Sequence, residues 1–137
     1  MAIRFFSDGV SFQLEGKRKI ARWLKQVADK EEKKAGHLFF IFVPDEIILD
    51  INNEFLQHND YTDIITFDNS TNDTISGEMY ISIDTVQSNA KEYQVDFRNE
   101  LLRVMVHGVL HLCGYKDSTA VEQLEIRAAE DKYLKDI

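Results

Sequence analysis

The run Val106-His-Gly-Val-Leu-His-Leu-Cys-Gly-Tyr-Lys-Asp117 decides how this chain is interpreted, because it spaces His107 and His111 four residues apart. On an α-helix that step is about 400° of rotation, so both imidazoles project from one face and can chelate one metal ion. Gly114 suits the left-handed residue that ends a helix, and the chain can then return Asp117 to the same ion. Two histidines and a third N or O ligand form a common catalytic zinc set with its fourth position left to water. The run therefore predicts a metal-activated hydrolase.

The phase of this helix supports that interpretation. With His107 at zero and about 100° per residue, His111 falls near 40° and Glu100 near 20°. Arg103 falls near −40° on the same scale. The apolar residues cluster on the opposite side: Leu102, Met105, Val109 and Leu112. A buried structural histidine is expected on the apolar face, whereas these two lie on the polar face, where solvent or substrate can reach them.

Composition indicates one domain over residues 1–137. The chain has 137 residues and a mass of 15.9 kDa, enough for a single core. It contains no run of eighteen apolar residues, so no membrane span is expected, and its start is too short and too polar for a signal peptide. Cys113 is the single cysteine, which excludes an internal disulfide, and its place on the apolar side of the helix predicts a core residue. These features fit a reducing, cytoplasmic location.

The charge is unevenly distributed along the chain. The net charge of −8 does not point to nucleic acid, yet residues 1–36 carry nine Lys or Arg and five Asp or Glu, a net of +4, leaving −12 for residues 37–137. Most of the basic excess lies in Lys17, Arg18, Lys19, Arg22 and Lys25. This run is either a solvated helix face or a local patch that contacts phosphate.

Hydrophobic periodicity and turn residues predict a small α+β fold. We expect a mixed sheet of about four strands, at 3–6, 38–43, 63–67 and 77–83, with the last two forming a hairpin. About five helices are expected, at 16–35, from 44 onward, at 84–93, 97–113 and 119–134. Asp96 is expected to cap the helix that carries the His pair, while Thr119 and Glu122 form a capping box for the final helix.

The spacing resembles the metzincin signature H-E-x-x-H-x-x-G-x-x-H. The chain matches both histidines and the glycine of this signature. It departs at Asp117, which takes the third ligand position, and at Gly108, which replaces the Glu that serves as general base in such proteases. Ordinary zinc proteolysis would therefore lack its proton acceptor, although the metal helix remains zincin-like.

The chain resembles the YbeY family of single-strand-specific endoribonucleases that mature ribosomal RNA. That family carries H-G-x-L-H-L-x-G-Y-D-H near its C-terminus, and residues 107–117 read His-Gly-Val-Leu-His-Leu-Cys-Gly-Tyr-Lys-Asp. Upstream, Asn52 followed by Tyr-Thr-Asp-Ile-Ile-Thr-Phe67 looks like the family segment N…P-T-D-V-L-S-F. Residues 77–82, Gly-Glu-Met-Tyr-Ile-Ser, look like its G-D-I-x-I-S strand. The three matches keep the family's order, and the length and element order fit the whole chain.

This chain departs from the family pattern at two positions. The family's third metal ligand is His, which is Asp117 here; carboxylate oxygen is also an acceptable zinc ligand. An arginine that the family carries after Asn-x-x-Tyr aligns with Leu56, so a phosphate contact made there in relatives is lost or moved. Arg103, near the His face, is a candidate substrate-binding replacement, although a surface arginine without that role is the plainer interpretation.

The resemblance implies a zinc-dependent endoribonuclease acting in ribosomal RNA maturation and ribosome quality control, with single-stranded or ribosomal RNA and the small ribosomal subunit as partners. One zinc ion is expected on His107, His111 and Asp117, though nickel, iron or manganese can use similar ligands. No general base is identified, and Asp63 and Glu100 are speculative candidates. Two rivals stay open: a zincin-like metallopeptidase or other metal-dependent hydrolase, and a non-catalytic ribosome-assembly factor with a structural metal.

The remaining polar residues are interpreted as ordinary surface groups. His37 and His58 have no partner at ligand spacing and are expected at the surface or at a strand end. The acids of the final helix are expected to form a solvated face: Glu122, Glu125, Glu130 and Asp131.

Overall fold

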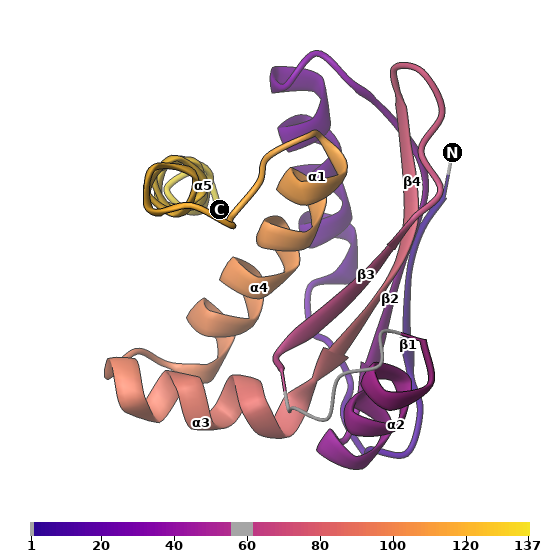
Figure 1. The fold of residues 1–137 in the computed structure, drawn as a ribbon, viewed down its shortest axis with the longest axis vertical. Helices are drawn as coiled ribbons and strands as arrows, with labels where there is room; N and C mark the ends of the chain where they lie inside the picture. Colours follow the sequence, from indigo (N-terminus) through magenta and orange to yellow (C-terminus); the bar gives the residue numbers. More distant parts are fainter. Residues whose placement is uncertain (1, 56–61) are drawn as a thin grey trace.

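The computed structural model describes residues 2–55 and 62–137, which form an α+β fold of nine elements (Figure 1). In chain order these are β1 (Ala2–Ser7), α1 (Lys17–Lys30), β2 (Lys34–Val43), α2 (Asp45–Phe55), β3 (Ile64–Asp68), β4 (Thr74–Ser82), α3 (Ile83–Tyr93), α4 (Phe97–Leu112) and α5 (Ala120–Leu134). The described part therefore confirms the predicted mixture of about four strands and five helices. Two positions of the sequence argument, Leu56 and His58, lie outside the described residues.

The strands form one mixed sheet in the order β1-β2-β4-β3. The pairs β1–β2 and β2–β4 are parallel, whereas β3 and β4 form the predicted antiparallel hairpin. The crossovers between parallel strands run through α1 and α2, as parallel neighbours require. The outer strands, β1 and β3, consequently lie at opposite edges of the sheet.

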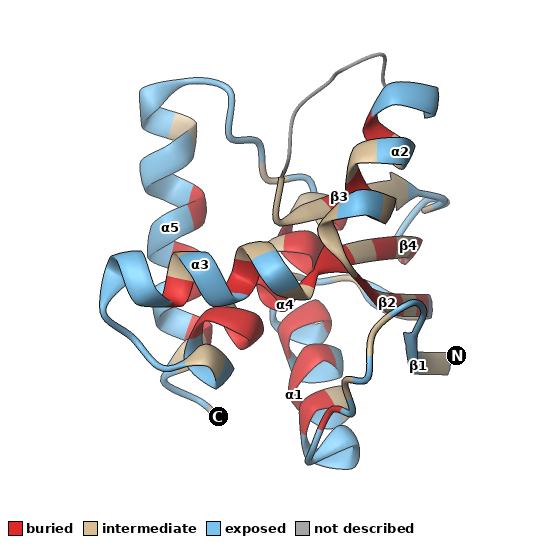
Figure 2. Cartoon of the chain, turned by 90° about the horizontal axis from the view of Figure 1, so that it is seen from below, coloured by how far each residue is buried: buried red, intermediate tan, exposed pale blue. Residues whose placement is uncertain are grey.

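Helices cover the two faces of the sheet unequally. On one face, α1 packs against β1 and β2, while α4 packs against β3 and β4 (Figure 1). The main core lies there, and α5 packs on α4 on the side away from the sheet. On the opposite face, α2 covers β3 and β4 over a smaller cluster that includes Val43, Ile48 and Ile65 (Figure 2). The helix with the His pair is thus held between the sheet and a further helix.

Helix α4 sits close to the sheet because residue 108 is glycine. A Cβ built on Gly108 would lie 2.8 Å from Cδ1 of Ile64 and 3.0 Å from Sδ of Met79. Both neighbours belong to the β3–β4 hairpin, and Met79 is fully buried. The helix begins where predicted, since the Asp96 carboxylate accepts a hydrogen bond from the backbone N–H of Asn99. Cap and close packing together fix the position of the histidines relative to β3.

The predicted helix over 16–35 is wrong at its C-terminal end. Helix α1 stops at Lys30, and Glu32 has a positive φ of 61°. Strand β2 already begins at Lys34, four residues before the predicted start, so Gly36 lies inside a strand. A Cβ on Gly36 would lie 2.2 Å from Oγ of Ser76 on the neighbouring strand, so this glycine permits close strand pairing and does not end a helix.

Candidate metal centre

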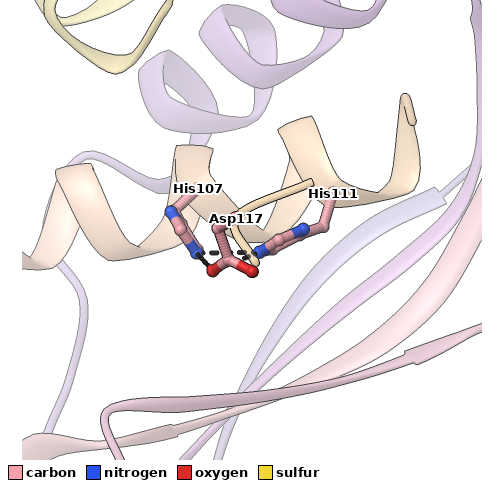
Figure 3. A group of neighbouring side chains, drawn as sticks. All are labelled: His107, His111 and Asp117. Atoms are coloured by element: carbon pink, nitrogen blue, oxygen red, sulfur yellow. Dashed lines mark hydrogen bonds and ion pairs between the residues drawn. The ribbon is translucent and has the colours of Figure 1, made fainter. Parts of the chain in front are cut away.

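Three side chains converge at the C-terminal half of α4 (Figure 3). His107 and His111 project from one face of the helix, and their Nε2 atoms are 2.9 Å apart. Gly114, with φ of 108°, turns the chain back as predicted, and Oδ2 of Asp117 lies 3.5 Å from Nε2 of His107 and 3.3 Å from Nε2 of His111. The ligand atoms of the three residues all lie within 4.8 Å of one another. The structure thus brings the predicted ligands together in a group that could hold a metal ion.

Hydrogen bonds at the Nδ1 atoms fix the orientation of the two imidazole rings. Nδ1 of His111 lies 2.9 Å from the backbone carbonyl oxygen of Tyr115, and Nδ1 of His107 lies 2.5 Å from Oε2 of Glu130. A carbonyl and a carboxylate accept hydrogen bonds, so both Nδ1 atoms are donors. In the neutral rings the two Nε2 lone pairs then face each other and Asp117. These lone pairs and the carboxylate could hold a cation between them, and two imidazoles with a carboxylate suit zinc.

Glu130 was expected on a solvated helix face, and that expectation is wrong. Its side chain is only 5% exposed and lies between His107 and Arg103. Nη1 of Arg103 donates to Oε1 of Glu130 at 2.9 Å, while Nη2 donates to Asp131 at 2.7 Å. Burial acts to lower the pKa of His107, but the hydrogen bond and charge of Glu130 outweigh it, so the pKa is raised above its usual range.

A signal for Glu130 exists in the sequence, although the argument from sequence missed it. The buried stripe of α5 consists of Ile126, Ala129 and Tyr133, and Glu130 falls at the i+4 position from Ile126, within that stripe. A carboxylate on a buried stripe needs a partner of opposite charge or a hydrogen-bond donor. The partner could not be named in advance, because His107 precedes Glu130 by 23 residues.

Helix α5 also supports the third ligand. Nε2 of Gln123 donates to the backbone carbonyl of Asp117 at 3.1 Å. The predicted capping box is present, since Thr119 and Glu122 bond reciprocally, and the Glu122 carboxylate also accepts from the backbone N–H of Ser118. The Asp117 side chain itself is 46% exposed, against 23% for His107 and 28% for His111. The carboxylate is therefore the candidate ligand nearest to solvent, at the end of a loop held by α5.

Two hollows adjoin the site on either side of His107 and Asp117. A cavity of about 600 Å³ runs along β3 and is also lined by His111 and Asn52. A second cavity, of about 280 Å³, lies between α3, α4 and α5. Asp63, just before β3, lines both cavities. The larger cavity therefore opens directly onto the three convergent side chains.

The surroundings of the site are rich in carboxylates. Burial raises the pKa of Asp63, although the charge of His107 acts in the opposite direction. Burial, together with the charge of Asp63, raises the pKa of Glu100, which is only 4% exposed. Both are therefore better proton acceptors than ordinary carboxylates, and Glu100 is less open to solvent than the helix phase indicated.

The other sequence candidates lie where ordinary residues are expected. His37 is exposed at the start of the pairing between β1 and β2, and it is not part of the three-residue group. Cys113 packs against the main core, and burial raises the pKa of its thiol to about 12. That thiol stays protonated at neutral pH, which agrees with the prediction of a core residue. Arg103 is 16% exposed and engaged by two carboxylates, so its role in substrate binding stays a prediction.

The fold and this three-residue group define a class, that of metal-dependent hydrolases with two histidines on one helix and a carboxylate from the loop that follows it. Within that class the chain belongs to the YbeY endoribonuclease family, because the family model described as Endoribonuclease YbeY matches residues 6–137. This confirms the resemblance inferred from the sequence motifs.

Relatives and a solved structure agree over nearly the whole chain. The Endoribonuclease YbeY of Porphyromonas gingivalis (strain W83) is 44% identical over 132 residues, covering 96% of this chain and 87% of the relative. That of Bacteroides thetaiotaomicron is 42% identical over 134 residues, covering 98% of each chain. The solution structure of TM1509 from Thermotoga maritima matches with a TM-score of 0.69 at 28% identity, covering 98% of this chain and 87% of that one. The α+β fold is thereby confirmed.

Proposed function

We propose that this chain is a zinc-dependent endoribonuclease that cleaves single-stranded RNA during ribosomal RNA maturation and quality control, on a single domain. The observation that carries the proposal is the pair of Nε2 atoms, 2.9 Å apart, facing Oδ2 of Asp117 while each Nδ1 atom is held by an acceptor. When bound there, zinc supplies Lewis-acid chemistry for phosphodiester hydrolysis. The family's names support RNA as the substrate.

The protein's own residues hold and orient the three ligands. His111 is fixed by the Tyr115 carbonyl, His107 by Glu130, and the Asp117 backbone by Gln123. Arg103 acts through Glu130, because the ion pair holds that buried carboxylate in place against His107. We infer a positioning role for Arg103 in place of the substrate contact expected from the sequence.

The larger cavity along β3 is the proposed path of the substrate strand. It is lined by Asp63 and by the β3 residues Ile64, Ile65 and Thr66, with His107, His111 and Asp117 on its other side. A scissile phosphate in this cavity would lie beside the proposed metal. Asp63 and Glu100 stay candidates for the proton acceptor, and their raised pKa values suit that task.

The metallopeptidase rival is disfavoured by the packing of Gly108. A glutamate at this position would be driven into Ile64 and Met79, because even a Cβ would lie 2.8 Å from the Ile64 side chain. The general base of zincin peptidases therefore has no room in this fold without a shift of α4. A non-catalytic assembly factor with a structural metal is the rival that experiment has to separate.

Elemental analysis of protein purified without added metal tests the metal site, and cleavage of single-stranded RNA tests the activity. We expect about one zinc per chain and RNA cleavage, both lost in His111→Ala, with Glu125→Gln as a control on the exposed side of α5. Adding zinc at about a hundred times its dissociation constant should stabilise the wild type by about 2.7 kcal/mol and His111→Ala much less. Zinc binding with no RNA cleavage would favour the assembly factor, and absence of zinc binding would refute the proposed metal site.

A further inference from the structure

A basic groove lies along the edge of the sheet farthest from the candidate metal centre. It is a hollow of about 300 Å³ between β1 and the start of α1, and its lining includes Arg4, Phe6, Lys17 and Arg18. We call these four residues the basic groove. Arg22 and Lys25, both exposed, continue the positive charge along α1.

The cations of this surface are not used to stabilise the fold. Arg4, Lys17, Arg18, Arg22 and Lys25 are all exposed. Among the described residues, lysine and arginine form ion pairs only at Lys30 and Arg103, neither of which belongs to this surface. The positive charges therefore remain available to an external anion.

The position of these cations is unfavourable for the helix itself. Lys17, Arg18 and Lys19 occupy the first turn of α1, which contains no acidic residue, and Gly16 provides no side-chain cap. A helix N-terminus carries partial positive charge. An acid in this turn would stabilise the helix by about 0.3–1 kcal/mol, whereas a cation destabilises it. Positive charge in this turn therefore lowers the stability of the helix. A face that is only solvated would give no reason for that cost.

Aromatic side chains lie beside the cations on the same edge. Phe6 is 47% exposed, and its ring meets Phe39 of β2 edge-on with centroids 6.0 Å apart. The Phe39 ring is followed by His37 at 5.9 Å, which gives a short row of rings across β1 and β2. The alternate β1 residues Ile3 and Phe5 pack into the main core, so Phe6 lies on the opposite face of the sheet from α1. The groove therefore extends around the β1 edge, from Lys17 and Arg18 on α1 to Phe6. Cations with neighbouring exposed rings are the combination that binds single-stranded nucleic acid.

The metal side of the molecule has the opposite character. Asp63, Glu100, Asp117 and Glu130 line the hollow beside the proposed cleavage site together with Arg103 and Arg127, so this side of the molecule offers a polyanion no excess of positive side-chain charge. Residues 37–137 carry a net charge of −12, against +4 for residues 1–36. An RNA substrate therefore gains its electrostatic attraction at a different place from its cleavage.

We propose that the basic groove is an RNA-binding surface that holds a segment of the substrate outside the segment being cleaved. The inference rests on the proposed function for its choice of RNA. The outer strands lie about 14 Å apart at three strand spacings, so an RNA longer than a few nucleotides can contact both edges. Cations at β1 supply affinity for phosphate, Phe6 supplies a ring for a base, and the β3 edge supplies the chemistry.

The salt dependence of RNA binding tests this proposal. Binding of a single-stranded ribosomal RNA fragment longer than twenty nucleotides is measured from about 50 to 200 mM salt in the His111→Ala background, which prevents turnover. The groove variant, Lys17→Gln/Arg18→Gln/Arg22→Gln, removes two cations of the basic groove and the adjoining Arg22. Its slope of log binding constant against log salt concentration should be shallower by about 2, at about 0.7 per phosphate contact. Over that fourfold salt range, the unsubstituted surface should lose about 15 to 20 times more affinity than the variant.

The matched control is Lys91→Gln/Lys132→Gln/Lys135→Gln, which removes the same charge from exposed positions outside the groove. It should leave the slope nearly unchanged, and neither triple variant should alter zinc content in the His111-containing protein. Phe6→Leu should weaken RNA binding several-fold without changing the slope, because it removes a ring and no charge. An unchanged slope in the groove variant, or an equal change in the control, would overturn the proposal. Because binding is measured without turnover, failure of the groove is distinct from failure of the proposed catalytic activity.

Discussion

The two edges of the sheet use charged side chains in opposite ways. Beside β3, the side chains that form and support the candidate metal centre are buried or half-buried except for the exposed Asp117, and each has a defined partner. Beside β1, the cations of the basic groove are exposed and have no ion pair among the described residues. The same sheet thus carries a partnered group of carboxylates and imidazoles at one edge and an exposed group of cations without ion pairs among the described residues at the other.

The difference follows from what each edge has to bind. A metal ion requires ligand atoms at fixed distances, so its ligands need partners that restrict their rotamers. A nucleic-acid backbone presents many equivalent phosphates, and cations on flexible side chains can follow it without a fixed geometry. Substitutions at the metal edge should therefore act through geometry, and substitutions of the cations at the basic edge should act through charge.

The largest effect is expected at Asp117. Asp117→Ala removes a ligand and should weaken zinc binding by more than about 100-fold, beyond the loss typical of outer partners. Asp117→His should retain binding, because imidazole is also a zinc ligand and the loop already brings residue 117 to the two histidines. Competition with a chelator of known affinity measures both. Wild-type affinity in Asp117→Ala would mean that the carboxylate is not a ligand.

The next effect tests the buried partner of His107. Glu130→Ala should weaken zinc binding by about 10- to 100-fold, because the imidazole loses its orienting acceptor. Glu130→Gln keeps an acceptor oxygen without the charge, so its zinc affinity should lie between that of Glu130→Ala and that of the wild type. Glu125→Gln on the exposed side of the same helix is the control, with no change expected. Equal affinities for all four proteins would show that Glu130 does not position His107.

A third prediction concerns the close packing that sets α4 against β3. Gly108→Ala should destabilise the fold by about 1–3 kcal/mol through overpacking against Ile64 and Met79. Helix propensity alone would stabilise the same variant by about 1 kcal/mol, so the sign of the change in unfolding free energy distinguishes the two effects. Urea denaturation of the metal-free protein measures it. A more stable variant would show that α4 can move away from the hairpin without cost.

The smallest effect is expected at the basic edge, where a substitution should raise the stability of the fold, whereas Gly108→Ala should lower it. Arg18→Glu places an acid in the first turn of α1 and should stabilise the fold by about 0.3–1 kcal/mol. The same change should weaken RNA binding and make its salt slope shallower. Thermal denaturation at low salt and RNA titration are the two measurements. A variant that loses stability would contradict the view that the groove is maintained against the preference of the helix.

Local signals in the sequence were sufficient for much of the candidate site. The spacing of His107 and His111 fixes their common face once a helix forms, and the positive φ of Gly114 gives the turn that returns Asp117. The caps at Asp96 and Thr119 were also predictable, because each involves a backbone N–H three residues away. Such features depend on neighbours within about one helical turn, which is the range over which residue type alone is informative.

The end of α1 shows where local reasoning failed. The polar run after Lys30 is compatible with helix, yet residues from Lys34 onward pair with β4 as an extension of β2. The pairing partner, Thr74, lies far along the chain, so sheet formation overrides a modest helix preference. The same pairing explains Gly36, whose role depends on how closely β4 approaches.

The sequence by itself determined the candidate ligand residues, the helix that carries two of them, the fold class and the concentration of positive charge near the N-terminus. Only the tertiary structure decided that Glu130 and Arg103 support His107, that Gly108 allows α4 to approach the hairpin, and that the positive charge and the metal ligands lie at opposite edges of one sheet. The physical reason is range: periodicity and caps arise from contacts between near neighbours in the chain. Burial, ion pairing and the placement of edges arise from contacts between segments that meet only when the whole core packs.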